Sequence, residues 1–84
     1  MNYYIKHEFE KRDWKLYKSE DNQDTYVRNS LFFIVGRNKD DTFFVSYPLR
    51  ESKYNYTTRF IDYEMMYTYM VDKLDYLDND FLDI

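Results

Sequence analysis

The chain has 84 residues, no cysteine, a single histidine and a formal net charge of −4. These features exclude a disulfide-stapled fold and leave little material for a histidine- or cysteine-based site. No run of residues is long and apolar enough for a membrane span, and the N-terminus lacks a signal-peptide pattern. We therefore expect one small domain over residues 1–84 that stays in the cytoplasm and holds no metal or cofactor.

The first dozen residues permit two interpretations. Apolar and polar side chains alternate along them, which suits a strand, but Ile5 and Phe9 also stand one helical turn apart among good helix formers. The balance favours a short helix within residues 2–12, with a strand as the alternative. Either element would pack against the same core.

The middle of the chain is predicted to form an antiparallel sheet of three or four strands. The apolar runs Leu31–Val35 and Thr42–Tyr47 are rich in β-branched and aromatic residues, and the polar segment Gly36–Asp41 between them has the length of a hairpin loop. Pro48 cannot donate to a ladder, so the second run ends there or lies at an edge. Trp14–Lys18 adds a strand, Glu20–Asp24 forms a polar turn leading into Thr25–Val27, residues 50–53 form a loop, and residues 54–60 make a further strand.

A C-terminal amphipathic helix is predicted over residues 61–78. Thr58 or Asp62 could cap its start, because a short side-chain oxygen can accept from a free backbone N–H of the first turn. Residues 79–84 have no period and are expected to fray or to dock through Phe81 and Leu82. The helical stripe, with spacings of three and four, consists of Tyr63, Met66, Tyr67, Met70, Leu74, Leu77 and Phe81. The predicted fold class is α+β, with this helix covering one face of the sheet.

The residues that carry catalysis are scarce. His7 has no cysteine or activated serine beside it in any familiar arrangement, and one glycine cannot build a phosphate-binding loop. The acidic groups around Asp21 and around Asp80 lack the spacing, central glycine and closing glutamate of a calcium-binding loop. The sequence therefore predicts a protein that is not an enzyme.

Charge divides the chain into two parts. Residues 1–60 hold eleven lysines and arginines against nine acids, whereas residues 61–84 hold Lys73 against seven acids. Three aspartates of the predicted helix follow one another at three-residue intervals, which advances successive carboxylates by about 4.5 Å along the axis. This spacing loosely resembles the advance of about 3.4 Å between phosphates on one strand of a duplex. The predicted partner-binding residues are Tyr69, Asp72, Asp75, Tyr76 and Asp78, with the tyrosines as anchors among the charges.

We therefore expect a non-catalytic inhibitor whose acidic helix occupies a basic surface of a nucleic-acid-handling protein. Its size and acidity are shared with counter-defence proteins of phages and other mobile elements, including anti-CRISPR proteins and DNA mimics, although no motif supports this analogy. The ordinary alternative is that the aspartates form the solvated side of an amphipathic helix.

Two further functions stay open. Surplus tyrosines could be buried in a homodimer, which would make the chain a self-associating structural module. A single-stranded nucleic-acid-binding module would stack bases on sheet aromatics and contact phosphates with basic residues, although the acidic net charge opposes it. The residues for that module are Phe32, Phe43, Tyr47 and Tyr56, with Arg28, Arg37, Lys39, Arg50, Lys53 and Arg59.

Overall fold

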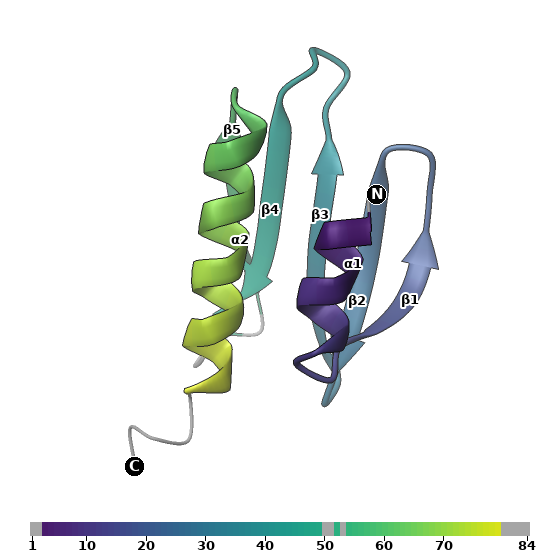
Figure 1. The fold of residues 1–84 in the computed structure, drawn as a ribbon, viewed down its shortest axis with the longest axis vertical. Coiled ribbons are helices and arrows are strands. Elements are labelled where there is room, and N and C mark those ends of the chain that lie inside the picture. The colour runs from purple at the N-terminus through teal and green to yellow at the C-terminus, as the bar shows by residue number, and fades with distance from the viewer. Residues whose placement is uncertain (1–2, 50–51, 53, 80–84) are drawn as a thin grey trace.

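The computed structural model describes residues 3–49, 52 and 54–79. Its elements are α1 (Tyr3–Glu10), β1 (Lys15–Ser19), β2 (Gln23–Arg28), β3 (Leu31–Arg37), β4 (Phe43–Pro48), β5 (Asn55–Phe60) and α2 (Tyr63–Asp78). The strands form one antiparallel sheet in the order β1-β2-β3-β4-β5, and both helices lie on the same face of it (Figure 1). The α+β class is confirmed.

The sheet has five strands, not the three or four predicted. The additional strand follows from a tight turn between β2 and β3, where Asn29 and Ser30 take positive φ angles of 51° and 66°. Two consecutive residues with positive φ fit the type I′ turn, whose twist matches that of the flanking strands. Pairing can therefore run without interruption from Gln23 opposite Gly36 to Arg28 opposite Leu31.

The N-terminal segment is a helix, as the balance of the sequence favours. Ile5 and Phe9 are both fully buried, so the spacing of one helical turn determines the structure of this segment. The helix ends in a Schellman motif: the N–H of Trp14 donates to the Phe9 carbonyl, and Asp13 takes the left-handed conformation with φ of 67°. This cap places the Trp14 ring edge-on to the Phe9 ring, with centroids 6.2 Å apart.

The second helix begins two residues later than predicted, at Tyr63, and ends at Asp78 as predicted. Asp62 is its cap, because its side chain accepts from the N–H of Glu64. Four stripe residues are buried in the core: Met66, Met70, Leu74 and Leu77. Phe81, Leu82 and the rest of residues 80–84 lie outside the described residues.

No helix in the described part of the chain is long and apolar enough to cross a membrane.

The single glycine lies inside a strand and not in the hairpin loop where it was predicted. Gly36 belongs to β3, and a Cβ atom built on it would lie 2.5 Å from the Phe44 ring and 2.7 Å from the Asn22 carbonyl oxygen. That oxygen accepts from the N–H of Arg37, so it is not free to move away. Glycine is therefore required for close packing of side chain and backbone.

The fourth strand, β4, ends at Pro48, which was one of the two predicted possibilities. The other possibility was an edge strand, but β4 lies between β3 and β5.

We expect Gly36→Ala to lower the free energy of unfolding by about 1 to 3 kcal/mol, the usual cost of forcing an extra methyl group into a packed site. Urea denaturation followed by circular dichroism would measure it. Lys39→Ala, an exposed substitution in the same hairpin, is the control and should cost less than about 0.5 kcal/mol. Equal stability of the two variants would contradict the close-packing explanation.

Candidate protein-binding cleft

The five residues predicted to bind a partner lie on three sides of α2. Asp75 and Asp78 face α1 and β2, Tyr69 and Tyr76 face the sheet, and Asp72 faces solvent. The structure brings Tyr69 and Asp72 together in one cleft. Assignment of all five residues to a partner surface stays a prediction.

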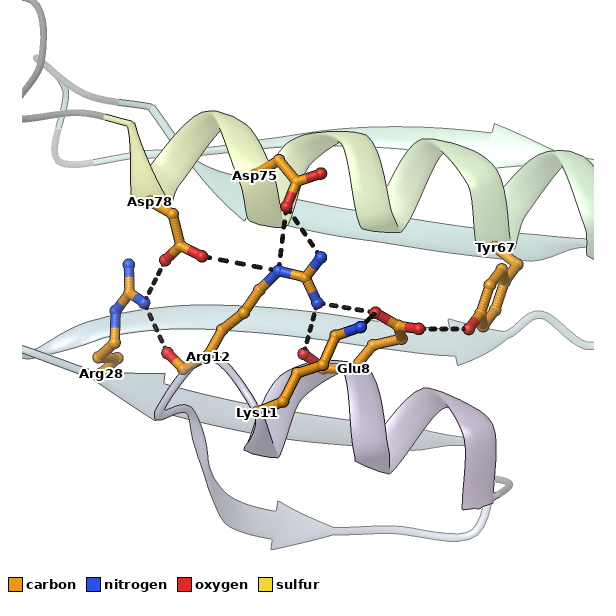
Figure 2. A network of polar contacts seen from close by, with 7 residues as sticks. All are labelled: Glu8, Lys11, Arg12, Arg28, Tyr67, Asp75 and Asp78. Atoms are coloured by element: carbon orange, nitrogen blue, oxygen red, sulfur yellow. Dashed lines mark hydrogen bonds and ion pairs between the residues drawn. The ribbon is translucent and has the colours of Figure 1, made fainter.

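Two arginines hold the last aspartates of α2 (Figure 2). Arg12 donates from Nη2 to Asp75 Oδ1 at 2.8 Å, and Arg28 donates from Nη1 to Asp78 Oδ1 at 2.6 Å. Both carboxylates lie near the negative end of the helix dipole, where α2 has no basic residue in its last turn. The arginines supply the compensating positive charge from outside the helix.

Glu8 extends this network to the middle of α2 (Figure 2). Its Oε1 accepts from Arg12 Nη1 at 2.7 Å, and its Oε2 accepts from the Tyr67 hydroxyl at 2.8 Å. Burial by itself would raise the pKa of Glu8, but the hydrogen bonds from Arg12, Tyr67 and Lys11 outweigh burial and lower the pKa to about 2. Burial and the bond to Glu8 raise the pKa of Tyr67 to about 12. At neutral pH a carboxylate, a guanidinium and a phenol therefore join the two helices.

The tyrosines on the sheet side of α2 surround a lysine. The rings of Tyr69 and Tyr76 stand edge-on to Tyr47 at 6.1 and 6.0 Å, and Lys73 Nζ lies 5.0 to 5.7 Å from the three ring centres. Burial, followed by the contact with Tyr69, raises the pKa of Tyr47 to about 12. Lys73 is the one basic residue of the sequence from 61 to 84, and the rings hold its charge beneath the helix. Its nearest approach to Asp72 is 3.5 Å.

A cleft of about 560 Å³ lies where the end of β5 meets the first half of α2. Met65, Thr68, Tyr69 and Asp72 recur along α2 at spacings of three and four, so they share one side of the helix. Asp72 keeps 71% of its side chain exposed. The lining residues, which define the β5–α2 cleft, are Phe60, Asp62, Glu64, Met65, Thr68, Tyr69 and Asp72.

The carboxylates of the β5–α2 cleft are only weakly compensated. Within residues 3–49, 52 and 54–79, the ion pairs include one for Asp72, through Lys73, and none for Asp62 or Glu64. Exposed apolar side chains continue the surface: Ile61 is 79% and Met65 59% accessible to solvent. Exposed apolar side chains that are rimmed by charged ones are typical of a protein interaction site.

Most of the β5–α2 cleft was missed by the sequence prediction, which followed the aspartates at three-residue intervals and the two tyrosines beside them. A signal was present in the sequence, because Ile61 and Met65 fall outside the buried stripe through Met66 and Met70. Apolar residues outside the buried stripe of an amphipathic helix indicate a second, exposed contact surface. Glu64 stands close to them in the first turn. Adding these residues to Asp72 would have located the cleft at the N-terminal half of the helix.

The sheet aromatics proposed for nucleic-acid stacking do not lie on one face. Tyr47 and Phe43 point toward the helices, and Tyr56 pairs with Tyr47 on that same side, whereas Phe32 points to the opposite face beside Tyr17. Among the basic residues of that hypothesis, Arg28 is paired with Asp78, while Arg50 and Lys53 lie outside the described residues.

The fold and the cleft define a small α+β protein with a carboxylate-lined cleft at one edge of its sheet. No protein-family model matches the chain, and the searches of curated proteins and solved structures likewise give no match. In the described ranges, no group of three or more histidine, aspartate or glutamate side chains is arranged to hold a metal ion.

Proposed function

We propose that the chain is a non-catalytic binding protein that places its β5–α2 cleft against a basic surface of a larger partner. The observation that carries this proposal is the group of three carboxylates, Asp62, Glu64 and Asp72, around an aromatic and methionine floor. Exposed charges attract an oppositely charged surface over roughly 10 Å at moderate salt, which speeds encounter. The apolar floor supplies contacts that persist after docking.

We further propose that the partner is a nucleic-acid-handling protein and that binding inhibits it. Proteins that bind phosphates carry the extended basic surfaces that suit such a cleft. An acidic protein seated there competes with the nucleic acid for the same cations. This is the action of a DNA mimic or an anti-CRISPR-like inhibitor from a mobile element, and it would take place in the cytoplasm.

Neutralising the cleft should weaken partner binding by about tenfold, since three exposed charges that each contribute about 0.5 kcal/mol sum to about 1.5 kcal/mol. The variant is Asp62→Asn, Glu64→Gln and Asp72→Asn combined. Asparagine is as good an N-cap as aspartate, so α2 keeps its start. Pull-down from the source cell at moderate salt would identify a retained basic protein, and titration of that purified protein over a salt series would give the affinities.

The matched control removes the same number of charges elsewhere: Glu10→Gln, Glu20→Gln and Asp21→Asn, all at exposed positions. Its affinity for the partner should stay within about twofold of wild type. An equal loss in the two triple variants would mean that net charge alone drives binding. Unchanged affinity in both would remove the cleft from the interface.

A further inference from the structure

β5 forms one edge of the sheet. It is the last strand in the sheet order, and within the described residues no strand pairs with its outer side. We propose that an extended, basic segment of the partner adds to this edge as a further strand. The inference rests on the proposed function, because it uses the same β5–α2 cleft and specifies how the partner enters it.

The two edges of the sheet differ in the features that prevent strand addition. β1 carries Lys15 and Lys18, and its register shifts between Leu16 and Lys18, which marks a bulge at Tyr17. Lysines and bulges are the usual means by which proteins protect an edge strand. β1 is therefore a poor template for another chain.

β5 is less protected than β1. It pairs with β4 without a register shift, from Phe43 opposite Phe60 to Pro48 opposite Asn55. Its six residues are mainly of types that favour strands. Its one basic residue, Arg59, lies 3.6 Å from Asp40 and is on the opposite face of the sheet from Phe60. The exposed apolar residues Tyr54, Tyr56 and Ile61 stand at its two ends. A regular edge without a bulge can pair with an extended peptide.

The cleft selects the chemistry of the added strand. Tyr69 lies over β5, with its hydroxyl 3.2 Å from Thr58 Oγ1 and its ring 4.9 Å from that of Phe60. A strand added about 4.8 Å outside β5 would send every second side chain, at intervals of about 7 Å, toward the same side as α2. Those side chains would enter the cleft, whose lining includes Met65 and Asp72. Lysine or arginine suits these alternate positions, because the long stem covers the apolar floor while the charge reaches the carboxylates.

A second copy of the chain is a less suitable occupant. Pairing of two β5 edges would bring two β5–α2 clefts to one seam, with Asp62, Glu64 and Asp72 contributed by each molecule. Like charges along a seam oppose association, whereas a basic segment compensates them. Charge complementarity therefore favours a foreign basic strand over self-pairing.

The test compares two peptides that differ only in their backbone. One is an alternating lysine–valine heptapeptide, and the other is the same peptide with N-methyl groups on alternate amides, which removes the donors of one edge. We expect the unmodified peptide to bind at least about tenfold more tightly and to slow hydrogen exchange at the outward amides of β5. The cleft variant should lose affinity for it by about tenfold.

Each other outcome has a defined meaning. Equal affinities for the two peptides, both weakened in the cleft variant, would overturn strand addition and leave the acidic binding site standing. If the peptide binds the cleft variant as tightly as the wild type, the result would count against the proposed function as well. Binding of neither peptide, or a dimer in sedimentation with β5 amides protected before any peptide is added, would overturn the basic-strand proposal.

Discussion

Phe9→Ala should lower the free energy of unfolding by about 3 to 5 kcal/mol, the cost of deleting a buried phenyl ring. Phe9 is fully buried, stacks on Tyr26 with ring centroids 3.9 Å apart, and meets Phe33 edge-on at 5.0 Å. Its carbonyl oxygen also accepts a hydrogen bond from the N–H of Trp14. Removing the ring leaves a cavity at the point where α1, its cap and the sheet are joined.

Urea denaturation with tryptophan fluorescence would report this loss directly, because Trp14 lies against the same ring. The matched control is Tyr4→Ala, which removes an aromatic ring of similar size from an exposed position on the same helix and should cost less than about 1 kcal/mol. A loss below about 1 kcal/mol for the Phe9 variant would show that α1 contributes little to the stability of the fold.

The elements with a strong local period were predictable from the sequence. α2 was found because its buried residues recur at helical spacing, and the apolar runs in β3 and β4 were found because they are long and β-prone. The Asn29–Ser30 turn escaped prediction because it lacks the glycine of the commonest two-residue hairpins. Without that turn, β2 could not be recognised as a full partner of β3.

Gly36 shows a different limit. A lone glycine among polar residues is typical of a turn, and only the three-dimensional approach of Asn22 and Phe44 reveals that it serves packing within a strand. Positions that need left-handed backbone are filled by other residues, including Asp13 and Asp41. Sequence spacing could not reveal a contact made between separate strands.

The candidate cleft lies on the helix that the sequence singles out, but the arrangement of side chains around that helix could not be predicted. Three-residue spacing makes Asp72, Asp75 and Asp78 neighbours along α2, yet each step turns the side chain by about 60°. Over two steps, the row of aspartates therefore passes from the solvent-exposed side of α2 to the side that faces α1. Arg12 and Arg28, which occupy that side, lie more than forty residues away in sequence, so their pairing with these aspartates depends on the fold.

Arg12→Met should cost about 3 kcal/mol of stability, because it leaves Glu8 and Asp75 without their shared cation while keeping most of the side-chain volume. Arg12 is only 11% and Glu8 15% exposed, so water cannot easily replace the lost contact. Urea denaturation at pH 7 would measure the loss. Lys18→Met, which removes a largely exposed cation paired with Glu20, should change stability by less than about 0.5 kcal/mol.

The same network makes stability depend on acid in a predictable direction. The pKa of Glu8 falls from an ordinary 4.5 to about 2 in the folded protein, so the unfolded chain binds the proton more tightly. The stabilisation from Glu8 is therefore complete above about pH 5 and is lost as pH falls toward 2. Glu8→Gln should flatten the pH dependence of the unfolding free energy between pH 2 and 5, and Arg12→Met should do so in part. An unchanged slope in both variants would show that the network does not couple the two helices, and acid sensitivity would then arise from carboxylates elsewhere in the fold.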